Sequence, residues 1–154
     1  MRSSRMIGAG VIAAAALGLA AASVGAHPDI ASPVQIHVIE HAISDTVTDT
    51  GASGDSSGDL LTFHNPIFDA SDSTRVGRDQ GDCIRIVPGR SWECRFVTRL
   101  AGGSLTVEGP FFDTHNSVLA VTGGTGVYRN ARGTMTLKSR AGGTEFDFIF
   151  NLIP

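Results

Sequence analysis

The amino-acid sequence predicts an all-β fold, an antiparallel barrel or sandwich, and two observations support this class. From Pro33 onward, apolar residues alternate with polar ones and many are β-branched or aromatic, whereas no long stretch repeats apolar positions at helical spacing. Segments rich in Gly, Asp and Ser separate these runs, as turns do. About eight short strands joined by short turns are typical of a barrel or a sandwich.

Predicted strands follow one another along most of the chain. The first lies near residues 34–38, and the polar segment 44–58 after it is expected to be a flexible loop. Residues 27–58 and 59–154 are expected to form two parts of one domain. The later strands are expected at residues 59–68, 74–77, 82–87, 91–100, 104–111, 118–122, 133–139 and 144–152.

Residues 1–26 have the layout of a cleavable signal peptide. Arg2 and Arg5 precede an apolar run at 7–22, and small residues lead to Ala26. The run is rich in Ala and Gly and shorter than the roughly 20 residues of a membrane-spanning helix, which disfavours a retained anchor. We therefore expect a secreted protein, extracellular or in the cell envelope, that begins at His27 and has no membrane attachment after cleavage.

The charge balance argues against nucleic acid as a partner. The chain has 12 Lys and Arg against 15 Asp and Glu, and losing Arg2 and Arg5 would leave 10 − 15, a net charge of −5. The basic residues are scattered along the sequence rather than clustered.

A hairpin around Pro88 and Gly89 predicts a disulfide bond. Cys83 and Cys94 are the two cysteines, and an even count in an exported chain favours pairing. With a two-residue turn, Cys83 lies directly opposite Cys94, where the Cα atoms of a non-hydrogen-bonded pair are about 4.5 Å apart. The turn itself is less favourable, because L-Pro-Gly prefers types I and II, whose twist fits hairpins poorly.

The same register places apolar residues on both faces of this hairpin. A sheet that is apolar on both sides must bury both, which indicates a closed barrel with a filled or ligand-holding lumen, its outer face covered by a loop or a partner chain. One face carries Cys83, Arg85, Trp92, Cys94 and Phe96, and the other carries Ile84, Ile86, Glu93 and Val97.

Three segments in order resemble the allene oxide cyclase and dirigent barrel superfamily. They are STRVGRDQG at 73–81, GSLTVEG at 103–109 and VTGGTGVYRNARG at 121–133. The segment 58–69 is also similar to a GD-x-x-x-F-x-N-x-x-x-D pattern of bacterial members, through Asp59, Phe63, Asn65 and Asp69. The resemblance implies an eight-stranded antiparallel barrel and is compatible with a homo-oligomer, a dimer or a trimer formed through the outer face.

The resemblance also implies a class of function. Members of the superfamily work without a cofactor, either directing the coupling of phenolic radicals or steering ring closure of an epoxide or polyene inside the lumen. We therefore expect the barrel to bind a small apolar or phenolic/polyene-like molecule, as a cofactor-independent isomerase/cyclase or a stereo-directing protein. A non-catalytic ligand carrier remains the alternative, because the same pocket can bind without turnover.

Three polar residues are the predicted catalytic candidates. By resemblance, Arg132 matches an arginine that lines the pocket of dirigents, although Val127 stands where those dirigents carry an acid. Asp69 matches an acid near the end of an early strand, and Asn65 lies where cyclases hold a polar network. As alternatives, Asp69 caps a turn and Asn65 precedes Pro66 in one.

Four aromatic residues are candidates for lining the lumen: Phe63, Trp92, Phe96 and Tyr128. Aromatic side chains on a strand face more commonly belong to the core, so this reading stays open. Arg85, opposite Trp92, could stack on its ring without any ligand.

No metal or nucleotide site is expected. The Gly123-Gly124-Thr125-Gly126 segment is interpreted as a structural turn, because no helix or Lys-Ser/Thr pair follows it. No His or carboxylate stands at zinc-finger spacing from the cysteines. A copper-binding histidine brace at His27 is a rival hypothesis, which needs a second histidine such as His37 or His41.

Overall fold

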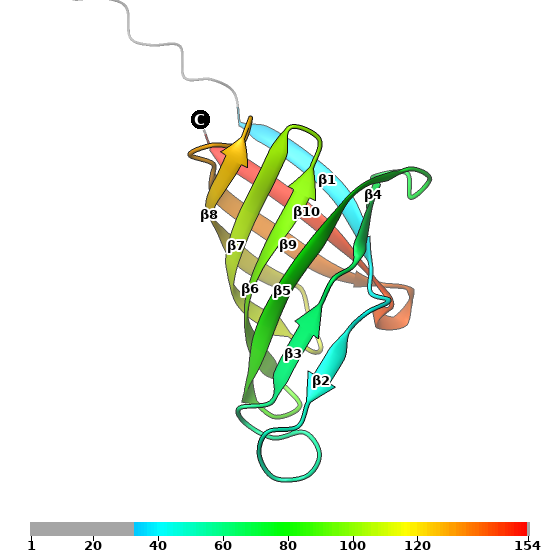
Figure 1. Ribbon diagram of the computed structural model, residues 1–154, viewed down its shortest axis with the longest axis vertical. Helices are drawn as coiled ribbons and strands as arrows, with labels where there is room; N and C mark the ends of the chain where they lie inside the picture. Colours follow the sequence, from blue (N-terminus) through cyan, green and yellow to red (C-terminus); the bar gives the residue numbers. More distant parts are fainter. Residues whose placement is uncertain (1–32, 154) are drawn as a thin grey trace, which may run out of the picture.

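The computed structural model describes residues 33–153, which form a closed eight-stranded antiparallel barrel (Figure 1). The predicted barrel is confirmed. The predicted signal peptide and His27 lie outside the described residues. The elements are β1 (Val34–His41), β2 (Thr46–Thr48), β3 (Leu60–Phe63), β4 (Pro66–Asp69), β5 (Arg75–Val87), β6 (Ser91–Leu100), β7 (Gly103–Phe112), β8 (Ser117–Gly126), β9 (Arg132–Arg140), the short 3₁₀ turn η1 (Ala141–Gly143) and β10 (Glu145–Ile153).

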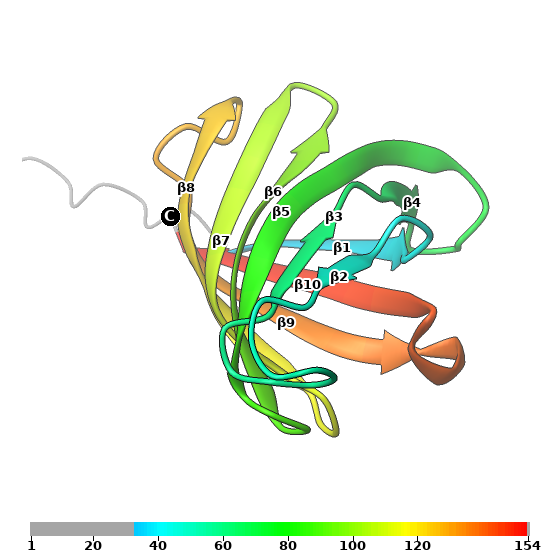
Figure 2. The same cartoon turned by 60° about the horizontal axis from the view of Figure 1, so that its bottom comes forward.

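The barrel closes through β5. The sheet order is β2-β3-β5-β4-β1-β10-β9-β8-β7-β6, and β5 also pairs with β6. Both β3 and β4 pair with β5, at Gly81–Ile84 and Arg75–Arg78 respectively, so together they occupy one position of the barrel. The strands wrap around one interior (Figure 2), and β2 adds to the edge of β3. The two-residue break between β3 and β4 is therefore a local interruption in a wall of the barrel.

One long strand, β5, replaces the two short strands predicted at 74–77 and 82–87. The polar and glycine-containing stretch between them interrupts the apolar alternation that strand prediction relies on. Gly81 is needed there because a Cβ atom would collide with the side chain of Phe96 on β6. Asp79 stands on the inner face, where an apolar residue is expected, and is fully buried.

The Gly123–Gly126 segment is strand rather than turn, so that prediction is wrong. These residues are the last of β8 and pair with β7, and the turn follows at residues 127–130. Gly124 has no room for a Cβ because the carbonyl oxygens of Ser104 and Tyr128 lie against it. Of the three glycines, Gly126 has a positive φ, at 60°. Glycine occupies these positions mainly because neighbouring backbone segments pass too close for a side chain, and less because of turn geometry.

The hairpin register and the disulfide are confirmed. Cys83 pairs with Cys94, is bonded to it, and their Cα atoms are 4.0 Å apart. The turn is longer than predicted, because a bulge shifts the register so that Val87 pairs with Ser91. Gly89 has a φ of 64° and the Arg90 N–H donates to the Val87 carbonyl at 3.0 Å. Pro and then Gly at the centre suit a type II turn, and the bulge reconciles that turn with the strands.

The inner face of the barrel is the hydrophobic core. Alternate residues of β10 point inward, as its pattern predicts, and Phe148 and Phe150 are fully buried. On β9, Met135 and Leu137 point inward in the same way. Burying a side chain of this size contributes about 1.5–3 kcal/mol.

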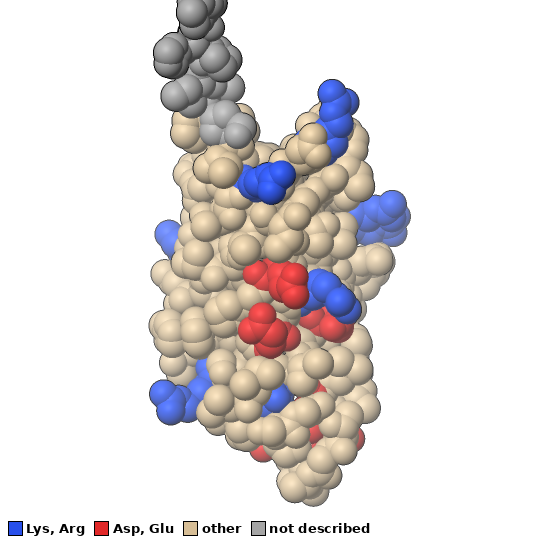
Figure 3. All heavy atoms as spheres, turned by 90° about the vertical axis from the view of Figure 1, so that its left-hand side faces the viewer, with Lys and Arg blue, Asp and Glu red and all other residues tan. Residues whose placement is uncertain are grey.

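The outer face keeps several apolar residues exposed. Ile84 and Ile86 are 47% and 52% exposed, and Val118 is 55% exposed. On the side shown in Figure 3, a small group of acidic side chains lies beside a basic one and most of the surrounding surface is uncharged. No described loop covers these outer apolar side chains. Within residues 33–153, no helix is long and apolar enough to cross a membrane.

The segment 44–58, predicted to be a flexible loop, contains β2 and is tied to one end of the barrel. Asp49 and Asp59 accept hydrogen bonds from backbone N–H groups of the segment itself. The Gly58 N–H donates to the Arg85 carbonyl at 2.9 Å, and the Arg85 N–H donates to the Asp59 carbonyl at 2.9 Å. These contacts were not predicted, and the flexibility of the segment stays a prediction.

Candidate functional site in the barrel lumen

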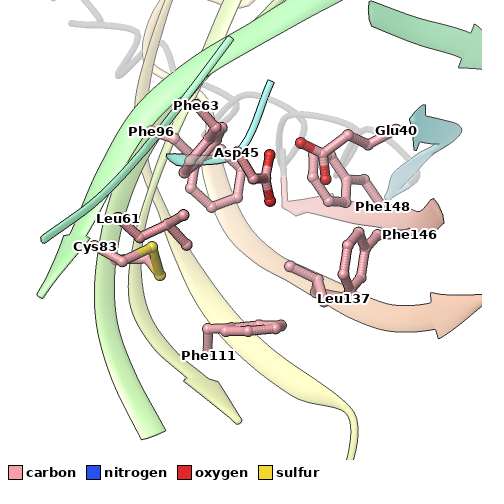
Figure 4. A pocket seen from close by; sticks show the side chains of 11 residues that line it. Glu40, Asp45, Leu61, Phe63, Cys83, Phe96, Phe111, Leu137, Phe146 and Phe148 are labelled. Carbon is pink, nitrogen blue, oxygen red and sulfur yellow. A yellow bond between two sulfur atoms is a disulfide. The ribbon is translucent and has the colours of Figure 1, made fainter. Parts of the chain in front are cut away.

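An apolar cavity with one acidic edge lies inside the barrel. Its cavity volume is about 50 Å³, and the surrounding space between atoms, which includes open solvent, amounts to about 390 Å³. Figure 4 shows the carboxyl groups of Glu40 and Asp45 turned toward this space, with Glu40 on the same side as Phe146 and Phe148 and facing Leu61 and Phe96. The cavity is lined by Glu40, Asp45, Leu61, Phe63, Cys83, Cys94, Phe96, Phe111, Leu137, Phe146 and Phe148.

The aromatic wall of the cavity is held by ring-to-ring contacts. The Phe96 ring packs against those of Phe63 and Phe148, with centroids 5.5 Å apart in each pair. Phe111 and Phe146 meet edge to face at 5.9 Å nearer the opening. The disulfide joins β5 and β6 within this wall. Several strands thus fix the rings, so the cavity is largely preformed.

Asn65 organises the polar edge of the cavity. It lies in the break between β3 and β4, where its backbone exchanges hydrogen bonds with that of Asp79 at 3.2 and 2.9 Å. Its side-chain Nδ2 donates to Glu40 Oε1 and to Asp45 Oδ1, each at 2.7 Å. Its Oδ1 accepts the backbone N–H groups of Ile43 and Ser44 at 3.0 and 2.9 Å. One buried amide therefore fixes both acids and the chain that carries Asp45.

Glu40 and Asp79 form a buried pair of carboxyl groups. Their side chains are 5% and 0% exposed. Among the described residues, neither carboxyl oxygen of Asp79 accepts a hydrogen bond from a nitrogen or hydroxyl donor. Asp79 lies close enough to Glu40 for the charge of one carboxyl to disfavour the charge of the other.

Burial keeps a proton on this pair near neutral pH. Loss of hydration raises the pKa of Glu40 to about 7, against a smaller opposing effect of the hydrogen bond from Asn65. Loss of hydration also raises the pKa of Asp79, to about 10, and the charge of Glu40 adds to the increase. The two groups titrate together, so the proton belongs to the pair.

The predicted polar site residues are placed in three different environments. Asn65 lies at the cavity edge, as described above. Asp69 ends β4 and accepts hydrogen bonds from the backbone N–H of Ser73 and from the Ser71 hydroxyl, which lower its pKa to about 2. It therefore caps a turn, the alternative raised from the sequence. Arg132 is exposed at the start of β9, on the face opposite the inward Gly133 and Met135, and does not line the cavity.

The four predicted aromatic residues are likewise divided. Phe63 and Phe96 line the cavity. Tyr128 is half-buried in the turn after β8 and packs against the core. Trp92 is buried under Arg85, whose guanidinium carbon lies 3.9 Å from the ring centroid, so the proposed stacking pair is present.

Arg85 is committed to ion pairs near the disulfide hairpin. Its Nε lies 2.6 Å from Asp55, and its Nη1 lies 2.7 Å from Asp113. These acids come from the 44–58 segment and from the loop after β7. Arg85 thus joins two loops to the barrel wall, and its charge is balanced within the protein.

A second polar cluster lies on the outside of the barrel. His41, Asp72 and Glu145 each place one ligand atom within 4.8 Å of the others, which would permit a metal ion. His41 Nε2 already lies 2.7 Å from Asp72, and the Arg140 guanidinium approaches Asp72 and Glu145 at 3.9 and 4.0 Å. The Arg140 guanidinium thus supplies a positive charge close to this cluster.

Similarity to known proteins establishes the family. The family described as allene oxide cyclase matches residues 29–152. This chain belongs to the allene oxide cyclase family. The superfamily resemblance seen in the sequence is thus confirmed.

Several solved structures have the same architecture. A pyocyanin demethylase is 25% identical, with a TM-score of 0.67 over 77% of this chain and 99% of that one. A pterocarpan synthase dirigent protein is 17% identical, with a TM-score of 0.66 over 81% and 97%. The exo-specific intermolecular Diels-Alderase AbnU is 15% identical, with a TM-score of 0.63 over 79% and 98%. The last two likenesses show the fold alone.

Three acidic residues of the site were not predicted from the sequence: Glu40, Asp45 and Asp79. Two of them left a signal. Glu40 continues the inward series Ile36 and Val38 on β1, so it is an acid at a core position. Asp79 continues the inward series of Cys83 and Gly81 back along β5. Asp45 gave no signal, because its position depends on the hydrogen bond from Asn65.

Proposed function

We propose that the lumen binds a small, largely apolar molecule and that the Glu40–Asp79 pair exchanges a proton with it, as in a cofactor-independent isomerase or cyclase. One observation carries this proposal: two carboxyl groups, Glu40 and Asp79, are buried together, and one of them, Glu40, lines an apolar cavity. Burial without a counter-charge costs stability, so such a pair is a candidate for function.

The chemistry follows from the positions of the groups. The phenylalanine rings restrict the ligand to few conformers and exclude water, which favours ring closure or rearrangement. Glu40 faces the cavity and has a pKa near neutrality, so it can both donate and accept a proton at ordinary pH. Asp79 lies behind it and holds the second proton site, while Asn65 fixes the Glu40 carboxyl.

Similar barrels support this function. Solved neighbours are named for reactions of small organic molecules, including a pyocyanin demethylase and a Diels-Alderase. Arg132, which the resemblance suggested for the polar role, is replaced in this proposal by Glu40, since Glu40 lines the cavity and Arg132 does not. Asp69 is assigned a structural role as a turn cap.

Export and self-association belong to the same proposal. The signal-like residues 1–26 and the disulfide support secretion, and N-terminal sequencing of protein recovered outside the cytoplasm should begin at His27. The exposed apolar side chains Ile84, Ile86 and Val118 support association through the outer face, as a dimer or trimer.

A cavity-filling variant tests binding. A neutral fluorescent naphthylamine should bind the wild-type protein and be excluded by Leu61→Trp, which fills the cavity. Ile84→Trp adds the same ring to the exposed outer face of the neighbouring strand and should leave binding unchanged. Leu137→Phe is a second filling variant in case Leu61→Trp unfolds. Equal binding by all four proteins would refute a lumen site.

Hydrogen exchange separates an enzyme from a carrier. A bound ketone or dienone with an acidic C–H should exchange it with D₂O faster in the presence of wild-type protein than with Glu40→Gln. Mass spectrometry of the recovered ligand measures the rate. Binding with no acceleration by the wild type would favour the alternative, a non-catalytic carrier.

A further inference from the structure

Every charged group that lines the lumen is acidic. Glu40 and Asp45 are the charged residues of the cavity, and the other described lining residues are apolar. Past Asp45, Phe111 and Phe146 the space continues into an open pocket at the end of the barrel. The described lining of that pocket adds Asp113 and His115 but no Lys or Arg. Asp113 is paired with Arg85, so Glu40 and Asp45 are the acids that a ligand meets at the cavity edge.

The nearest buried cation does not change this balance. Arg85 is neutralised by Asp55 and Asp113, and its guanidinium faces Trp92 rather than the cavity. An anionic ligand would have to displace one of these acids to gain a partner. A buried ion pair that loses one member leaves an uncompensated charge, which is strongly unfavourable.

The acidic edge also has unused hydrogen-bonding capacity. Asp79 is fully buried behind Glu40 and is not part of the cavity lining, so Glu40 and Asp45 are the acids that can meet a ligand. Glu40 receives one donor from Asn65. Carboxyl groups with few donors are matched best by a ligand that brings an N–H or a positive charge, because charge-assisted hydrogen bonds are the strong ones.

We propose that the ligand is a flat conjugated molecule that carries a cationic or N–H-donating nitrogen and no carboxylate, with the nitrogen held by Glu40 and Asp45. This inference rests on the proposed binding function of the lumen. The Phe63, Phe96 and Phe111 side chains supply faces and edges for a conjugated ring. They also favour a cation next to a ring face.

Three two-ring probes of similar size test the charge preference: 4-aminoquinoline, which is protonated at neutral pH, neutral naphthol and anionic naphthoate. Calorimetric titration at neutral pH should give the tightest binding for aminoquinoline and the weakest for naphthoate, with at least about a tenfold difference in Kd. Asp45→Asn should reduce that ratio by about threefold or more, because Asp45 is exposed to solvent and its charge is partly screened. Glu93→Gln removes one charge from the exposed outer face and should leave the ratio unchanged.

The outcomes separate this inference from the proposed function. If naphthol binds but aminoquinoline binds no more tightly than naphthoate, the charge preference is refuted and the lumen site stands. If Asp45→Asn and Glu93→Gln change the ratio equally, the preference comes from overall charge and not from the cavity edge, which also refutes the inference. If none of the probes binds, the proposed lumen site fails and this inference fails with it.

Discussion

Replacing Glu40 by Gln should remove a pH dependence from the stability of the barrel. Between pH values near 4.5 and 7 the folded protein holds a proton on Glu40 that the unfolded chain releases, because burial raises this pKa from 4.5 to about 7. The contribution is therefore fully present at low pH, and stability falls as pH rises through this window. At about 1.4 kcal/mol for each pKa unit, the shift corresponds to about 3 kcal/mol.

Urea unfolding of the oxidised protein from about pH 5 to about pH 8 measures this effect. The free energy of unfolding of the wild type should fall across the range, and that of Glu40→Gln should fall by about 2–3 kcal/mol less. Asp79 acts in the same direction, since its pKa is also raised. The exposed acid Glu93 provides the matched control, and Glu93→Gln should follow the wild type. A wild-type profile that is flat, or that Glu40→Gln reproduces, would refute the carboxyl pair.

Three further predictions concern the rest of the barrel. In urea unfolding, the Cys83→Ser, Cys94→Ser double variant should be about 3 kcal/mol less stable than the wild type. Thiol titration of the denatured, unreduced wild type should find no free sulfhydryl. Two reactive thiols would contradict the disulfide bond. Arg85→Met should lower the free energy of unfolding by about 2–3 kcal/mol, because Asp55 and Asp113 lose their ion-pair partner. The control variant Arg95→Met, at an exposed residue, should lower it by less than about 1 kcal/mol. Equal effects of the two substitutions would count against the Arg85 ion pairs. EDTA should leave the circular dichroism spectrum of the protein unchanged, because no metal is expected to be needed. Stoichiometric binding of copper to the protein, lost when His27 is replaced, would overturn this expectation.

Strand positions were predictable wherever side chains alternate between core and solvent. β6 (Ser91–Leu100) lies where its pattern predicted it, since most of its inward residues are apolar and most of its outward ones are polar. The register of Cys83 with Cys94 was also predictable, because a short hairpin leaves few pairings that bring two thiols together. In both cases the information is local, within one strand or one turn.

Prediction failed where contacts distant in sequence decide the local structure. Gly124 and Gly81 look like turn residues, yet each lies in a strand because a neighbouring chain passes too close for a Cβ. Asn65 looked like a residue of an Asn-Pro turn, and its function as the amide that holds Glu40 and Asp45 depends on residues 20 to 25 positions away. Single-strand periodicity carries no information on such contacts.

The two buried charge systems of the barrel show why one is assigned to structure and the other to function. Arg85 is balanced by two acids and an aromatic ring of the same chain, so it requires nothing further. Glu40 and Asp79 have no counter-cation among the described residues, and they are balanced by a retained proton. On the proposed function, a bound ligand exchanges that proton or supplies the positive charge that residues 33–153 do not supply to the pair. For this reason the proton exchange is proposed at Glu40 and Asp79 and not at Arg85.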